Sequence, residues 1–274
     1  GVIEFLRGTL YTRQGGGFSL SFVISSVVSL LEHMGMLEQR AGVLAATPLG
    51  ERVSRLYIDP LTAHRMVSIL TQKEQPTSLT LVHGICSTPD MRTLYVRGSE
   101  FEDIESYVEE HSSELSHIPA PESADYDAFV REVKTARLLL EWMDEASEDA
   151  LCSRYRVGPG DIRALVETAR WLAHAMTELA RLVHSEAYGL ASRLERRMQY
   201  GVKEELLPLV SIRGIGRVRA RRLYDAGYKK PLDLTLKGEH AIAEILGEKT
   251  AQKVLLGAGA GKEQHPSQRR LTEF

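Results

Sequence analysis

The stretch GPGDIRALVETARWLAHAM, residues 158–176, decides the fold, because it carries a clear helical pattern of apolar residues. Apolar residues recur every three or four positions in this stretch, so their side chains fall on one stripe of a helix. The stripe consists of Ile162, Leu165, Val166, Ala169, Leu172, Ala173 and Met176, and it continues through Leu179, Ala180 and Val183. We expect this face to be buried against other helices.

Trp171 lies on the other side of this helix, roughly 145° from the centre of the stripe at about 100° per residue. Glu167, His174 and Glu178 share its face. Two interpretations remain open from the residues alone. Either a neighbouring helix covers the indole, or the indole is a platform on which nucleobases stack, which requires no particular base sequence. The basic residues nearby that can contact phosphates are Arg163, Arg170, His174 and Arg181.

The whole chain has the composition of a soluble globular protein, with 274 residues, 43% hydrophobic and 26% charged residues, and a net charge of −3. This length predicts one large domain or two to three small ones. The two cysteines, Cys86 and Cys152, form no CxxC pair, and no Cys/His group has zinc spacing. We therefore expect no metal site and a reducing, cytoplasmic setting. The chain starts with Gly1 inside an apparent helix, so we expect it to be part of a longer protein.

Charge is distributed unevenly along the chain. Residues 100–149 hold sixteen Asp and Glu against three Lys and Arg, whereas residues 193–230 hold eleven Lys and Arg against four Asp and Glu. The acidic segment is typical of a solvated helical surface. The basic segment indicates a surface that attracts and holds phosphates.

The first sixty residues predict a winged-helix domain over residues 1–60. A helix is expected from Ser19 or Ser21 to His33, with Phe22, Val23, Val27, Leu30 and Leu31 as its buried positions. Two short strands should flank a turn at residues 40–42, and Thr47-Pro48 is a cap with proline at the first position of the next helix. The order helix, helix, hairpin, helix is that of a winged-helix domain.

The rest of the chain is expected to be almost entirely helical. Residues 61–200 predict a helical bundle, residues 201–257 a small helix-hairpin-helix domain, and residues 258–274 a flexible tail. The fold class is thus mainly α.

The stretch LVSIRGIGRVRARRLYDAG, residues 209–227, predicts two short helices joined at Gly214-Ile215-Gly216. Glycine supplies the backbone freedom for such a turn, and the free N–H groups of the second helix form an anion site. Ile212, Ile215, Ala220 and Leu223 should hold the helices together, and the basic residues around the turn are Arg213, Arg217, Arg219, Arg221 and Arg222. This pattern resembles the helix-hairpin-helix, which grips a DNA backbone without reading its sequence. The alternative is a glycine-rich turn followed by a solvated basic helix.

A second, weaker copy of this pattern occurs around Leu246-Gly247, and we interpret it as structural. The run GAGAGK at residues 257–262 lacks the spacing of a phosphate-binding P-loop, so we expect no ATP site there. The chain shows no catalytic constellation of its own.

The parts in this order resemble the C-terminal half of archaeal superfamily 2 DNA repair helicases of the Holliday-junction-migration group. The matching stretches are TPLGERVSRLYIDPLTA (47–63), GPGDIRALVETARWL (158–172) and IRGIGRVRARRLYDAG (212–227). The resemblance implies a seven-helix-type ratchet bundle and two RecA-like motor domains in the parent protein, which hold ATP and Mg²⁺. This chain carries no motif for either ligand.

The resemblance also implies roles for particular residues. It places Trp171 on the ratchet helix that lies along the tracking single strand, as a base-stacking residue. The family tends to have an arginine two turns earlier, where this chain has Ala164 with Arg163 beside it. In the terminal hairpin domain, the family's RAR run corresponds to Arg219-Ala220-Arg221.

The last residues offer a possible protein contact. Gln268, Leu271 and Phe274 resemble the motif by which replication proteins bind the sliding clamp, although the usual second aromatic is missing.

We therefore expect the DNA-handling part of an ATP-dependent 3′-to-5′ helicase that remodels stalled or branched forks. The alternative is an independent winged-helix DNA-binding protein that reads duplex DNA through residues 19–33. That segment contains no Arg or Lys, which disfavours reading of the major groove.

Overall fold

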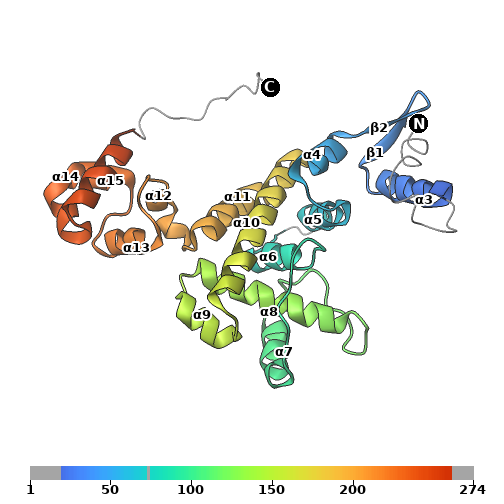
Figure 1. The fold of residues 1–274 in the computed structure, drawn as a ribbon, viewed down its shortest axis with the longest axis horizontal. Helices are drawn as coiled ribbons and strands as arrows, with labels where there is room; N and C mark the ends of the chain where they lie inside the picture. The colour runs from blue at the N-terminus through green and yellow to red at the C-terminus, as the bar shows by residue number, and fades with distance from the viewer. Residues whose placement is uncertain (1–19, 73–74, 261–274) are drawn as a thin grey trace.

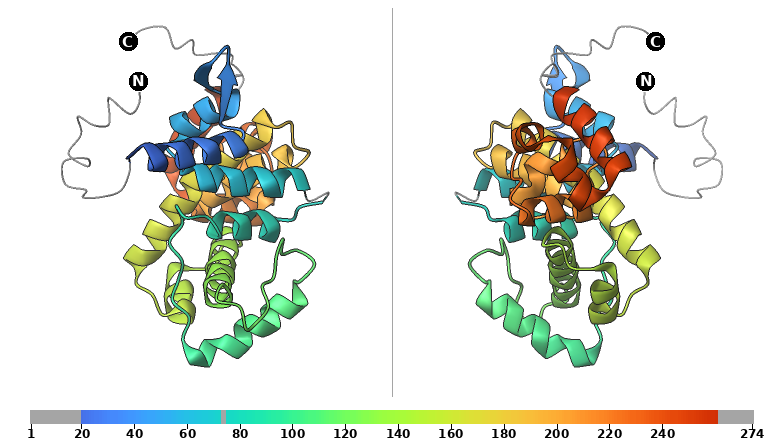
Figure 2. Two further views of the ribbon diagram at one scale, coloured as in Figure 1. Left: turned by 90° about the vertical axis from the view of Figure 1, so that its right-hand side faces the viewer. Right: turned by 90° about the vertical axis from the view of Figure 1, so that its left-hand side faces the viewer.

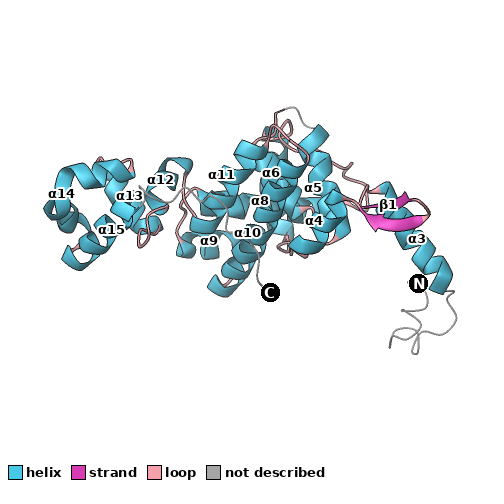
Figure 3. Cartoon of the chain, turned by 90° about the horizontal axis from the view of Figure 1, so that it is seen from above, coloured by secondary structure: helices cyan, strands magenta, loops and turns pink. Residues whose placement is uncertain are grey.

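The computed structural model describes residues 20–72 and 75–260 of the chain. As the sequence predicts, the structure is mainly α-helical, and the described part contains a single two-stranded sheet. Seen from above, the molecule is elongated, with the small sheet at one end and helices α14 and α15 at the other (Figure 3). None of the described helices combines the length and the apolar character needed to cross a bilayer.

The N-terminal region consists of α3 (Leu20–His33), β1 (Leu37–Arg40), β2 (Val43–Ala46) and α4 (Pro48–Leu56). The strands pair antiparallel, and the two-residue turn between them has positive φ at Ala41 (50°) and Gly42 (80°). This backbone matches the twist of a tight hairpin. Thr47 caps α4 as predicted, because its hydroxyl accepts a hydrogen bond from the backbone N–H of Gly50 at 3.1 Å.

The predicted burial of α3 is wrong at three positions. Phe22, Val27 and Leu30 are 71%, 48% and 46% exposed, respectively. Only the C-terminal part of the helix approaches the core, through Leu31 and the buried Met34 that follows. The sequence pattern shows which side chains are apolar, but no other element within the described residues covers this face of α3.

The middle of the molecule is a bundle of helices. Its elements are α5 (Pro60–Gln72), α6 (Ser78–Cys86), η1 (Gly98–Glu100), α7 (Phe101–Glu110), α8 (Tyr126–Met143), α9 (Glu148–Tyr155), α10 (Pro159–Leu182) and α11 (Tyr188–Tyr200). Helix α6 is buried along its whole length between its neighbours. Helix α10 packs against α11, α5, α6 and α9, whereas α7 lies at the edge of the bundle, at the bottom of Figures 1 and 2.

The predicted apolar stripe of α10 is confirmed. Its members from Ile162 to Ala180 are at most 9% exposed, and Val183, just after the helix, is half-buried. Pro159 occupies the first turn, and the carboxylate of Asp161 accepts a hydrogen bond from the backbone N–H of Gly158 at 3.0 Å. The stripe thus anchors α10 in the bundle and leaves its opposite face available.

The C-terminal region has its own hydrophobic core, which extends from Val202 to Val254. It comprises η2 (Glu204–Leu206), α12 (Leu207–Val210), α13 (Arg217–Asp225), α14 (Pro231–Leu246) and α15 (Glu248–Ala260). Gly238 has a φ of 83° and kinks α14. Residues 257–260 of the glycine-rich run lie in α15 and form no loop.

Gly201 joins the bundle to this C-terminal region. Its φ of 62° lies in the left-handed region, and a Cβ atom at this position would lie 2.6 Å from Cε2 of Trp142. Both the backbone conformation and the close approach of the indole therefore require glycine.

Candidate nucleic-acid interface

Trp171 lies on the outer face of α10, as the sequence predicts, but the end of α4 covers one of its edges. The indole Nε1 donates a hydrogen bond of 3.0 Å to the backbone carbonyl of Leu56 in the last turn of α4. The side chain nevertheless remains 36% exposed. A neighbouring helix thus covers part of the indole, whereas stacking of a base on its exposed part stays a prediction.

The basic residues near Trp171 differ in how far they are engaged by protein partners. Arg170 is exposed and forms no ion pair within the described ranges. Arg163 approaches Glu148 at only 3.5 Å, and Nδ1 of His174 lies 3.0 Å from Glu195 of α11. Ala164 is exposed one position after Arg163. Arg170 is therefore the cation on this face best able to meet a phosphate.

Two carboxylates share the face of Trp171, and one of them is neutralised. Glu178 binds Arg52 of α4 at 2.7 Å and Arg181 at 3.1 Å, so its charge is balanced by two guanidinium groups. Glu167 is exposed and opposes the approach of phosphate.

The predicted helical hairpin is present in the C-terminal region. Gly214 adopts a φ of 92°, and Gly216 is the N-cap of α13. The four predicted contacts, Ile212, Ile215, Ala220 and Leu223, are buried in one cluster. The first free N–H groups of α13 therefore follow directly on a tight glycine turn, which is the arrangement of an anion site.

The five arginines of the hairpin divide into two groups, and three of them point outward. Arg213 and Arg222 are exposed and form no ion pair within the described part of the chain. Arg219 is exposed as well, and its Nη1 donates to the carbonyl of Gly214 at 2.7 Å. This contact places a positive charge at the glycine turn.

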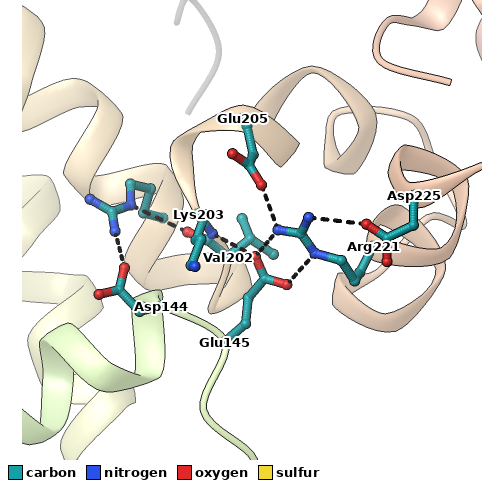
Figure 4. Close-up of polar contacts among 8 residues, drawn as sticks. Asp144, Glu145, Val202, Lys203, Glu205, Arg221 and Asp225 are labelled. Atoms are coloured by element: carbon teal, nitrogen blue, oxygen red, sulfur yellow. Dashed lines mark hydrogen bonds and ion pairs between the residues drawn. The ribbon is translucent and has the colours of Figure 1, made fainter. Parts of the chain in front are cut away.

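The other two arginines face the bundle instead. Arg221 donates two hydrogen bonds to Glu145, at 2.9 Å from Nε and 2.7 Å from Nη2, and it also contacts Glu205 and Asp225 (Figure 4). The guanidinium of Arg217 lies 4.9 Å from the ring centre of Trp142 and donates to the carbonyl of Ala146. These two side chains connect α13 to the segment that follows α8.

The electrostatics of this contact follow from its partial burial. Burial raises the pKa of Glu145, but hydrogen bonds and charges from Arg221 and Lys203 outweigh that effect, so its pKa is lowered. Hydrogen bonding to Glu145 raises the pKa of Arg221, whereas burial lowers that of Arg217. At neutral pH this is a charged, bidentate pair, which is a strong class of hydrogen bond.

Sequence reasoning missed Leu56 and Glu145, because their partners are far away in the chain. Leu56 and Trp171 are separated by 115 residues, and Glu145 and Arg221 by 76. No local spacing could have paired them. No group of three or more His, Cys, Asp or Glu among the described residues is placed to bind a metal ion.

Comparisons with known proteins match the two regions that carry these residues. A family model described as archaeal helicase, domain 4, matches residues 79–201, and one described as SAM-like helix-hairpin-helix tandem matches residues 206–260. The chain is 40% identical over 271 residues to the ATP-dependent DNA helicase Hel308 of Methanocella arvoryzae. It is also 36% identical to the protein of that name from Methanocaldococcus jannaschii over 263 residues, and from Thermococcus kodakarensis over 242.

The chain is thus similar to part of these archaeal ATP-dependent DNA helicases, in its bundle and in its helical hairpin. The three alignments cover 96%, 94% and 85% of this chain, but only 36%, 21% and 21% of the respective helicases. The chain therefore spans about a third or less of these relatives. The helicase match at residues 79–201 contains Trp171, and the hairpin match at residues 206–260 contains all five arginines of the hairpin.

The remaining predicted contact is in the C-terminal tail. Gln268, Leu271 and Phe274 lie outside the described residues.

Proposed function

We propose that this chain is the DNA-handling part of an ATP-dependent 3′-to-5′ DNA helicase that unwinds and remodels stalled or branched replication forks. ATP and Mg²⁺ bind RecA-like motor domains of the same polypeptide, outside this chain. The chain alone binds single-stranded and forked DNA but hydrolyses no ATP. The names of the relatives support the helicase activity, and the geometry around Trp171 supports the DNA contact.

The observation that carries this proposal is the partly exposed indole on an otherwise anchored helix. Trp171 is fixed at its edge by Leu56 and is 36% exposed, so one face can stack on a base without reorganisation of the ring. Arg163, Arg170 and His174 lie nearby and contact the phosphates. In the intact enzyme, closure of the motor moves the strand past Trp171, and stacking resists backward slippage.

The hairpin provides a second DNA contact in this proposal. The backbone N–H groups behind Gly214 and Gly216, together with Arg213, Arg219 and Arg222, bind the phosphates of the outgoing strand. Arg217 and Arg221 also belong to this basic surface, but their bonds to the bundle give them a positioning role while those bonds persist.

The N-terminal region supplies a contact for the motor domains. Phe22, Val27 and Leu30 on α3, and Val43 and Leu44 on β2, are exposed apolar side chains at one end of the molecule. Exposed apolar clusters typically mark protein contacts. We assign this face to the motor rather than to duplex DNA, because α3 carries no Lys or Arg.

The division into four units is part of the proposal, with a winged helix over 1–60, a ratchet bundle over 61–200, a hairpin domain over 201–257 and a tail. The separate hydrophobic cores before and after Gly201 support the boundary there. At residue 60 the two units share one core, since Met36 and Val53 belong to the same buried cluster as the bundle.

Fluorescence of Trp171 tests the DNA contact directly. The chain contains two tryptophans, so Trp142→Phe leaves Trp171 as the sole indole. We expect an oligo(dT) strand to quench this fluorescence, and its affinity to fall as salt rises. Duplex of the same length is the control. Binding of duplex alone, without quenching by the single strand, would support the independent winged-helix protein instead.

The tail is proposed to bind the sliding clamp through Gln268, Leu271 and Phe274. Replacing all three with alanine should abolish co-elution with the clamp and leave affinity for oligo(dT) unchanged. Retained co-elution would exclude this motif as the contact.

A further inference from the structure

Helix α4 is attached to α10 at two points, one turn of α4 apart. Nη1 of Arg52 binds Oε2 of Glu178 at 2.7 Å, and the carbonyl of Leu56 accepts the hydrogen bond of Trp171 at 3.0 Å. Both points lie on the face of α10 that carries the indole. The end of α4 is therefore held in a defined position beside Trp171.

Tyr57 follows directly on this contact. The carbonyl bonded to Trp171 belongs to the peptide bond between Leu56 and Tyr57, so Cα of Tyr57 lies within about 6 Å of the indole nitrogen. The side chain of Tyr57 is 87% exposed, more than that of any other large apolar or aromatic residue described as exposed. Two aromatic side chains with exposed surface thus start from adjacent positions on α4 and α10.

The backbone of Tyr57 adopts a conformation that is uncommon for residues other than glycine, although Arg156 adopts it as well at the end of α9. Tyr57 has φ 57° and ψ 29°, the left-handed conformation that ends α4. Such a position favours glycine, and α11 does end in this way, at Gly201 with φ 62°. A bulky residue there costs free energy that its exposed ring does not recover by burial, and such strain concentrates at functional sites.

Charges of both signs surround Tyr57, and the exposed arginines among them can contact a nucleic-acid backbone. Arg55 is 75% exposed at its side chain and lies 3.6 Å from Glu51, and Arg170 is exposed beside Trp171. The nearest carboxylate of α10 toward α4, Glu178, is balanced by Arg52 and Arg181. Glu51, Asp59 and Glu167 are exposed opposing charges, and Asp90 lies close by, since it accepts a hydrogen bond from the backbone N–H of Asp59 at 2.7 Å.

We propose that Tyr57 is a second aromatic platform for the single strand, which stacks on a base close to the one that contacts Trp171. This inference rests on the proposed function of Trp171 and adds a direct single-strand contact from the N-terminal region. Stacking tolerates any base, so the site takes single-stranded nucleic acid without sequence preference.

Substitutions at Tyr57 test the proposal in the full 274-residue chain by anisotropy of a labelled oligo(dT). Tyr57→Ala should weaken binding roughly tenfold, and Tyr57→Phe should retain it, because the ring and not the hydroxyl stacks. Tyr95→Ala is the matched control, since Tyr95 is 69% exposed but precedes η1 in a different part of the bundle. Equal binding by Tyr57→Ala and the unchanged protein would overturn the proposal.

Tyr57→Gly separates DNA binding from folding. Glycine relieves the left-handed backbone, so the melting temperature should stay level or rise while affinity for oligo(dT) falls. A fall in both quantities would instead assign Tyr57 a purely structural role.

Trp171→Ala distinguishes failure of this inference from failure of the proposed function. If Trp171→Ala weakens binding and Tyr57→Ala does not, only the second platform is excluded. If neither variant weakens binding, the single-strand path along α10 is excluded as well. Photo-crosslinking of a 5-iodouracil-containing strand should label Tyr57 in the unchanged chain, and crosslinks to Trp171 alone would contradict the proposal.

Discussion

Arg221 on α13 and Glu145 after α8 form a bidentate ion pair, with nitrogen–oxygen distances of 2.7 and 2.9 Å, across the junction between the bundle and the hairpin. Glu145 also accepts a hydrogen bond from the backbone N–H of Lys203 at 3.2 Å, next to the connecting Gly201 and Val202. A single carboxylate therefore joins the junction and α13, and together with the contacts of Arg217 it orients the hairpin.

Glu145→Gln should loosen this junction. The amide retains the shape but loses the charge and one of the paired acceptors, so we expect a loss of about 1–3 kcal/mol in the stability of the contact. Hydrogen exchange at residues 217–225 should accelerate. Glu205→Gln is the control, because Glu205 makes one contact with Arg221 at the more exposed edge, and its effect should be smaller. Equal effects of both variants would refute a special role for Glu145.

The outward and inward arginines of the hairpin should respond differently to substitution. Arg219→Ala combined with Arg222→Ala should weaken DNA binding and reduce the slope of log affinity against log salt by about 1–2, with little change in melting temperature. Arg221→Ala should lower the melting temperature, because it leaves Glu145 without its partner. An unchanged salt slope in the double variant would exclude the hairpin as a DNA contact.

Glu132 on α8 predicts a pH dependence of stability. Burial raises its pKa from 4.5 to about 7, with Arg65 opposing and Asp125 adding to the shift, and Nε2 of His83 lies 3.6 Å away. A carboxyl whose pKa is raised by folding stabilises the folded state when protonated. Its contribution is complete below pH 4.5 and is lost as pH rises toward 7.

Glu132→Gln should therefore raise the free energy of unfolding at pH 8 by about 1–3 kcal/mol relative to the unchanged protein, and with it the melting temperature. At pH 4.5 the change should be smaller. Thermal unfolding at both pH values measures this. The exposed Glu122→Gln provides a control for the change in net charge. A stabilisation of equal size at both pH values would contradict the assignment.

Alanine substitutions at two glycines should change the stability of the chain in opposite directions. Gly201→Ala should destabilise the chain by about 2–4 kcal/mol, since it adds a Cβ 2.6 Å from Trp142 at a φ of 62°. Gly160→Ala, in the first turn of α10 with no atom within 4 Å, should stabilise it by about 0.5–1 kcal/mol. Denaturant unfolding of the two variants distinguishes them, and a neutral Gly201→Ala would contradict the described junction.

In the intact helicase, Trp171→Ala should reduce unwinding more than ATP hydrolysis, because stacking resists slippage and takes no part in the chemical step. Trp171→Phe keeps a ring but loses the hydrogen bond to Leu56, so its unwinding activity should lie between that of the unchanged helicase and that of Trp171→Ala. Equal losses of unwinding and hydrolysis in both variants would indicate a folding defect, which thermal unfolding detects.

Local patterns in the sequence were sufficient for much of this structure. The stripe of α10, the cap at Thr47, the hairpin turn at Ala41-Gly42 and the glycine turn at Gly214–Gly216 all follow from contacts between residues a few positions apart. Such periodicity and turn chemistry are properties of short segments. They locate helices and turns without information about the rest of the chain.

Tertiary structure alone decided which of these segments meet. Phe22 was expected in a core because it is apolar, but whether a neighbour covers it depends on packing, and it is exposed. Leu56 reaches Trp171 across 115 residues, and Glu145 reaches Arg221 across 76. The sequence determined the helices and the chemistry of their side chains. Only their packing decided which arginines face outward and which edge of the indole is covered, because those contacts join residues with no local relationship.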